Sequence, residues 1–156
     1  MLPIVLKAVH VLSSMLFLGL GLGSVFYKVR AYRRGELAVV AFCDREIVLA
    51  DWLFTVPSGI VLPVTGLWLA TLYQLPLTTP WILAGLGGWA FAGVTWLPAA
   101  FLQIRMRTLS GLAARTGEAL PPAYHRAHRV WMILGLPSFA AAMFALWAMI
   151  AKHAAF

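Results

Sequence analysis

The chain has 156 residues, of which 62% are hydrophobic and only 11% are charged, and its formal net charge is +7. Soluble domains average roughly 45–50% apolar and about 25% charged residues, so this composition excludes an ordinary soluble domain. It predicts a single polytopic transmembrane domain over residues 1–156. The basic residues flank apolar runs and form no patch as wide as a nucleic-acid groove, so no nucleic-acid partner is expected. Cys43 is the single cysteine, which excludes an internal disulfide and a CxxC motif.

Four apolar runs are long enough to cross a bilayer and predict transmembrane helices at roughly residues 3–29, 47–73, 81–107 and 124–153. Consecutive spans alternate in direction, so the expected fold is an all-α, antiparallel four-helix transmembrane bundle. Residues 37–46 indicate an amphipathic segment that leads into the second span. The first run is longer than that of a signal peptide, and its basic cluster follows it, so no cleavable signal peptide is expected.

The Lys and Arg residues predict the orientation in the membrane. The connection after the first span carries four of them, and the connector between the third and fourth spans carries five with its flanks. The turn between the second and third spans carries none, and only Lys7 and Lys152 lie near the opposite ends. The positive-inside rule therefore places both basic connections in the cytoplasm and both termini in the periplasm of a bacterial inner membrane. The helices are expected to extend beyond the bilayer on the cytoplasmic side.

The second span is unusual because it combines an acid and two prolines with a long apolar sequence. Pro57 and Pro63 each remove a backbone donor, which membrane helices tolerate where neighbouring helices bond the freed carbonyls. Small and polar side chains lie on one helical face, and such a face is expected to point toward protein. On a helical wheel the following residues lie within roughly 40° of Asp51 or just beside that arc: Thr55, Ser58, Gly59, Thr65 and Gly66.

Asp51 is embedded in apolar sequence on the cytoplasmic side of the second span. An isolated charge in lipid costs ~2–3 kcal/mol or more, so this carboxylate must pair, stay protonated or reach water. Arg105 and Arg129 are the cations nearest in depth, and we predict a structural ion pair or water-bridged contact from Asp51 to one of them. A proton relay and a site for a basic substrate are the alternatives.

His10 is the main candidate for a cofactor ligand, because it lies about 10 Å inside the first span and imidazole is a common axial ligand of haem iron. Ser14 shares its stripe, and Gly85 and Gly88 of the third span lie at a similar depth, where absent side chains would leave room for a macrocycle. We therefore predict a cofactor site at His10, Ser14, Gly85 and Gly88, with His10 as the iron ligand. The alternative is a neutral structural histidine bonded to Ser13, Ser14 or a backbone carbonyl.

A second axial ligand is not evident from the spacing. His153 lies on the same side of the membrane but nearer the outer surface. His125 and His128 belong to the cytoplasmic end beside arginines, where they could hold a metal or form a solvated edge. The methionines, Met149 included, do not align with a histidine at ligand spacing and are interpreted as core residues.

Four segments, KAVHVL, ADWLFTVPSGIVLPVTG, WLPAAFLQIRMR and RVWMILGLPSF, together resemble a bacterial family of small four-helix integral membrane proteins of unknown function. The resemblance covers nearly the whole chain and implies the fold and a membrane location. More remotely, the layout is similar to the HemJ-type protoporphyrinogen oxidases and to the CopD copper-resistance membrane domain. HemJ-type proteins share K-x-x-H in the first helix (Lys7 and His10), a proline-bearing second helix ending in G-x-W-L (residues 66–69), and a lysine near the C-terminus. That resemblance implies that His10 is a haem b ligand.

The chain also departs from the HemJ-type pattern. The third helix of that family carries a functional lysine, whereas residues 81–103 carry no charge, and RVWMILGLP replaces the R-x-x-N-E-x-P signature. The resemblance therefore does not extend to the oxidase activity, and the sequence does not decide whether the protein is an enzyme. Two functions remain: a haem- or porphyrin-binding redox protein that carries electrons between quinone and an outside partner, or a non-catalytic accessory or scaffold subunit. Homo-oligomerisation stays open.

Overall fold

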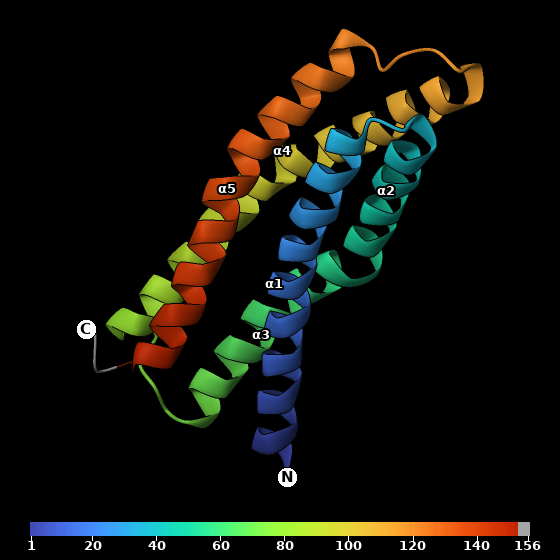
Figure 1. Ribbon diagram of the computed structural model, residues 1–156. Coiled ribbons are helices and arrows are strands. Elements are labelled where there is room, and N and C mark those ends of the chain that lie inside the picture. Colours follow the sequence, from blue (N-terminus) through green and yellow to red (C-terminus); the bar gives the residue numbers. More distant parts are fainter. Residues whose placement is uncertain (153–156) are drawn as a thin grey trace.

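The computed structural model describes residues 1–152 as a set of long helices (Figure 1). These are α1 (Leu2–Arg34), α2 (Leu37–Ala50), the π-helical turn η1 (Asp51–Thr55), α3 (Val56–Leu72), α4 (Pro80–Thr116) and α5 (Pro122–Ala151). Because α2, η1 and α3 follow one another without a break, the described chain forms four rods, each long and apolar enough to span a membrane. The predicted all-α, four-helix membrane fold is confirmed, while the predicted end of the last span at residue 153 lies outside the described residues.

The rods extend beyond the predicted spans at one end of the molecule. With a rise of 1.5 Å per residue, α1 is about 50 Å long and α4 about 55 Å, against a hydrocarbon core of about 30 Å. The two connections at this end follow Gly35 and Gly117, whose positive φ angles of 75° and 72° allow the left-handed turn that ends a helix. We call this end the inner end. The chain start, the turn 73–79 and the end of α5 lie at the opposite, outer end (Figure 1).

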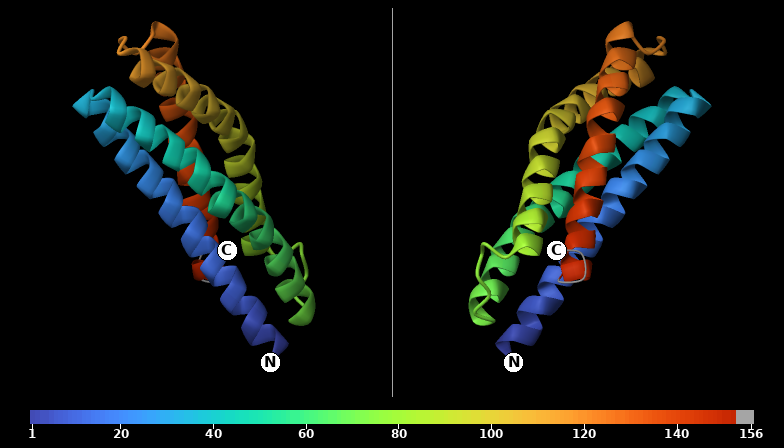
Figure 2. Two further views of the ribbon diagram at one scale, coloured as in Figure 1. Left: turned by 90° about the vertical axis from the view of Figure 1, so that its right-hand side faces the viewer. Right: turned by 90° about the vertical axis from the view of Figure 1, so that its left-hand side faces the viewer.

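The four rods form two hairpins that cross at an angle (Figure 2). α4 packs against α5 along its length, α2 packs on α4, and α3 packs on α1 but has few close contacts with α4. The larger core lies toward the inner end, around Met106, Tyr124 and Trp131, and a smaller one at the outer end includes Ala70 and Trp81. Most large apolar side chains point outward and are exposed, as contact with a lipid bilayer requires.

The polar face predicted for the second span is confirmed. Asp51, Thr55, Ser58 and Thr65 are each at most 8% exposed. The π turn at Asp51–Thr55 ends two residues before Pro57, and the Val56 N–H donates to the Asp51 carbonyl. A π turn adds one residue to a helical turn, and it lies here beside a proline that has no N–H of its own to donate.

Pro63 shows how this span tolerates a proline at membrane depth. An uninterrupted helix would place the N–H of residue 63 on the carbonyl of Gly59, and proline removes that donor. The indole Nε1 of Trp89, on α4, donates a hydrogen bond of 3.0 Å to this carbonyl instead. The expectation that a neighbouring helix bonds a freed carbonyl is therefore confirmed at Pro63, and the bond also connects α3 to α4.

Replacing Trp89 by Phe should lower stability by about 1–3 kcal/mol, the usual cost of leaving a buried polar group unpaired. In a Pro63→Ala background the same replacement should cost less, because an alanine at this position restores the intrahelical donor to the Gly59 carbonyl. Unfolding of all four variants in detergent measures this coupling. Additive losses would show that the indole bond does not replace the missing backbone bond.

A cysteine at Thr78, which is exposed at the outer end, should react readily with a membrane-impermeant thiol reagent in intact cells. A cysteine at Ala119, exposed at the inner end, should react only after lysis. Both are introduced with Cys43 replaced by Ala, so that the natural thiol does not contribute. The reverse pattern would overturn the predicted orientation.

Candidate functional site

A large cavity opens among α1, α3, α4 and α5 in the outer half of the bundle. Its volume is about 780 Å³, within the roughly 300–1,000 Å³ of small-molecule and cofactor sites. Its walls are mostly Leu, Ala, Gly and Trp residues, and only a few lining residues are polar. We call it the outer cavity, and the lining residues that the argument uses are Lys7, His10, Ser14, Gly85, Met149 and Lys152.

His10 is half-buried on α1 and is oriented by α3. Its Nδ1 lies 2.9 Å from Thr65 Oγ1, and the Thr65 hydroxyl donates to the Val61 carbonyl at 2.7 Å. When the Thr65 hydroxyl donates its single proton to the Val61 carbonyl, the Thr65 oxygen accepts from His10, and this arrangement assigns the ring proton to Nδ1. The lone pair of the neutral imidazole is then on Nε2, the atom needed to bind a metal. Gly66 allows this contact, because a Cβ there would lie 3.1 Å from His10 Cε1.

The structure places three of the four predicted cofactor residues at the outer cavity. His10, Ser14 and Gly85 line it, although the Ser14 hydroxyl donates to the Val11 carbonyl of its own helix at 2.7 Å. Gly88 does not line it. A Cβ at Gly88 would lie 2.9 Å from the Ala141 carbonyl oxygen, so this glycine brings α4 and α5 close together and leaves no room for a macrocycle.

Met149, interpreted from the sequence as a core residue, packs against the smaller core at the outer end, and it also lines the outer cavity. Its methyl group lies where a Cβ of Gly85 would be, so the space at Gly85 holds the end of the methionine side chain. Spacing could not reveal that His10 and Met149 line one cavity, because they come from helices at opposite ends of the chain. Lys7 and Lys152 add two cations to the same cavity, and Lys152 Nζ lies 5.8 Å from the Trp81 ring centroid.

In the described chain Asp51 makes no direct ion pair with Arg105 or Arg129, and the predicted water-bridged contact stays a prediction. Asp51 Oδ1 accepts a hydrogen bond of 2.8 Å from Thr55, and Oδ2 is buried without a hydrogen-bond partner among the described residues. Arg105 and Arg129, the two predicted partners, are both exposed. Asp51 instead lines a second cavity of about 600 Å³ between α3 and α4, which we call the inner cavity. Phe17 and Trp89 line both cavities and separate them.

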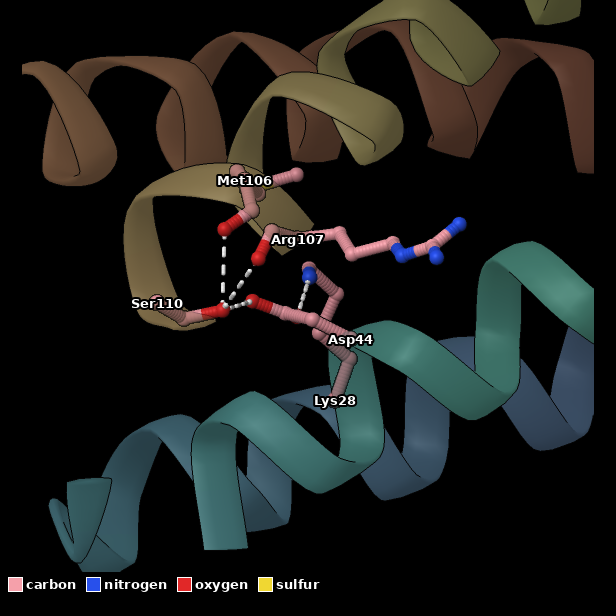
Figure 3. A network of polar contacts seen from close by, with 5 residues as sticks. All are labelled: Lys28, Asp44, Met106, Arg107 and Ser110. Carbon is pink, nitrogen blue, oxygen red and sulfur yellow. Dashed lines mark hydrogen bonds and ion pairs between the residues drawn. The ribbon is translucent and has the colours of Figure 1, made fainter. Parts of the chain in front are cut away.

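The buried ion pair of the described chain joins Lys28 of α1 to Asp44 of α2, each 1% exposed (Figure 3). The Ser110 hydroxyl on α4 lies 2.8 Å from Asp44 Oδ2 and 2.9 Å from the Met106 carbonyl. Arg107 takes part only through its carbonyl oxygen. The network thus connects three helices at the inner end.

Aromatic rings of α5 complete the surroundings of Lys28. Its Nζ lies 5.9 Å from the Tyr124 ring centroid and 5.5 Å from that of Trp131, distances at which a cation is attracted to a ring face. In the sequence, Lys28 belongs to a basic cluster and Asp44 to an amphipathic segment, so neither stands out as a buried charge. The signal that identifies the pair is their position, since one precedes and the other follows a tight interhelical connection at the same depth.

These features define the class of protein: a four-helix polytopic membrane protein with a buried ionic network at its inner end and a histidine-lined cavity in its outer half. Residues 4–153 match the family described as predicted integral membrane protein (DUF2269), and the chain belongs to this family. No curated protein and no solved structure matches the chain significantly.

Replacing Asp44 by Asn should destabilise the protein by about 3–5 kcal/mol, because it leaves the Lys28 charge buried without a partner. Glu46→Gln is the matched control, since its ion pair with Arg45 is exposed and should contribute at most ~1 kcal/mol. The double variant Lys28→Met, Asp44→Leu should recover most of the loss. Equal effects of the Asp44 and Glu46 substitutions on unfolding in detergent would contradict the role of this pair.

Proposed function

We propose that the protein is a haem b- or porphyrin-binding redox protein of the bacterial inner membrane, with the cofactor in the outer cavity and His10 as its iron ligand. The observation that carries this proposal is the position of His10, which lines a cavity of about 780 Å³ and is held through Nδ1 by Thr65. With the ring proton on Nδ1, the Nε2 lone pair would be available to a metal. The K-x-x-H resemblance to HemJ-type proteins points to the same residue.

The other lining residues suit an amphiphilic macrocycle. The apolar walls match a porphyrin ring, and Lys7 and Lys152 are cations that can pair with its carboxylates. Met149 lines the same cavity, and its thioether would serve as a second ligand beside His10. Ser14 bonds its own helix, and Gly88 serves helix packing, so neither is needed to hold the cofactor.

A bound haem would supply one-electron transfer, and the protein would hold it away from water and adjust its potential. With both termini in the periplasm, the outer cavity lies near the periplasmic surface, where an outside redox partner can approach. A quinone in the bilayer is the matching partner on the other side. This arrangement fits an electron carrier better than an enzyme with a water-soluble substrate.

Protein expressed with haem supplied should show a Soret band after purification, and His10→Ala should abolish or shift it. His125→Ala is the matched control, because this histidine is exposed at the inner end and bonds Tyr32. Its spectrum should equal that of the wild type. Met149→Leu, which keeps a similar volume, should shift the band if methionine is the second ligand and should have no effect otherwise.

Two results would contradict parts of this proposal. If the protein binds no haem, the accessory or scaffold function is favoured. If haem is bound and His10→Ala leaves the spectrum unchanged, another residue is the ligand.

A further inference from the structure

We propose that the inner cavity binds the head group of a membrane quinone or quinol, with the Asp51 carboxyl group as its hydrogen-bond partner. This inference extends the proposed function by assigning a site to the quinone partner. The binding itself does not require haem in the outer cavity, so the two proposals can fail separately.

One carboxyl oxygen of Asp51 is buried without a hydrogen-bond partner among the described residues. The residue is 8% exposed, and Thr55 satisfies Oδ1, so this oxygen is Oδ2. Buried polar atoms without a partner are rare in native structures, and each requires an explanation. Gln103 also interacts with this carboxyl group, but within the described chain Oδ2 lacks a hydrogen bond of good geometry, and its side chain lines a cavity of about 600 Å³ in which a ligand can bond it.

The charges at the inner cavity favour a neutral ligand. Asp51 is the only ionisable side chain among the described residues that line the inner cavity, so no cation there would hold an anionic ligand. The exposed arginines Arg45, Arg105 and Arg107 surround this end of the bundle and disfavour a cationic ligand. A neutral head group remains. A quinone carbonyl accepts a hydrogen bond from a carboxyl group, and a quinol hydroxyl donates one to a carboxylate, so both redox states match Asp51.

The lining of the inner cavity suits a flat ring. Trp52 of η1 and Trp89 and Trp96 of α4 provide flat aromatic walls. Gly93 of α4 also lines the cavity, and a Cβ at this position would meet no atom within 4 Å, so there is free space beside the rings. Gln103, 5% exposed, lies next to the carboxyl group and adds an amide that both donates and accepts.

The depth of the inner cavity and its opening toward lipid suit a membrane quinone. Asp51 is 22 residues before Tyr73, hence about 33 Å from the outer end, which is close to the inner boundary of a hydrocarbon core about 30 Å thick. Lining residues such as Val94 and Phe101 are 70% and 71% exposed toward the lipid side. A polar head group can therefore lie at the boundary while its isoprenoid tail leaves sideways between α3 and α4.

Decylubiquinone is the probe, and its binding to the detergent-purified protein is measured by calorimetry and by quenching of tryptophan fluorescence. The wild type should bind it saturably. Asp51→Leu should weaken binding about tenfold or more, the loss of one hydrogen bond to a charged or buried group. Gly93→Leu, which fills free space without touching Asp51, should abolish binding while the protein stays folded.

The matched control is Glu46→Gln, an exposed acid on the same rod, which should bind like the wild type. His10→Ala should also bind decylubiquinone normally, so a failure of haem binding does not affect this test. Unsaturable partitioning, or wild-type affinity in both the Asp51 and Gly93 variants, would overturn the proposal. Asp51-dependent binding of tetraphenylphosphonium without binding of decylubiquinone would also overturn it, and would assign the cavity to organic cations.

Discussion

The buried charge of Lys28 is the constraint on which the arrangement of the helices depends. Removing an ammonium ion from water costs several kcal/mol, and the cost is offset only by a partner with good geometry and further hydrogen bonds. Asp44 supplies the partner, Ser110 bonds the second oxygen of that carboxylate, and Tyr124 and Trp131 present ring faces. These residues come from α1, α2, α4 and α5, so one cation fixes the relative positions of all four rods at the inner end.

Toward the outer end the helices are bound mainly by packing of small residues and by single hydrogen bonds. Gly88 brings α4 and α5 together, Thr65 orients His10, and Trp89 bonds the carbonyl that Pro63 leaves free. This looser region contains the outer cavity, and the inner cavity lies between it and the ion-pair network, with Trp89 and Phe17 lining both. The buried ionic network thus holds the inner ends of the helices, and the space for ligands lies between it and the outer end.

The sequence predicts the fold well, because span length and the polar faces of single helices are local properties. It places His10 and Ser14 at a cavity and the Asp51 face toward protein for the same reason. It fails where two helices must be compared. The pairing of Lys28 with Asp44, the role of Gly88 in packing and the presence of His10 and Met149 at one cavity depend on rotation and register between helices. Depth alone suggested Arg105 and Arg129 for Asp51, but both side chains are exposed.

The π turn at Asp51–Thr55 makes one continuous rod serve two sets of neighbours. Before it, α2 faces α4 through Asp44 and Ser110, and after it, α3 faces α1 through Thr65 and His10. Each residue of an α-helix advances the side-chain direction by about 100°. The extra residue of the π turn therefore rotates the side chains of α3 relative to those of α2 by a fixed angle. The number of residues in this span is therefore under constraint, and not only their identity. A change in its length would rotate the residues of α3 that face the outer cavity relative to the residues of α2 that form the ion-pair network.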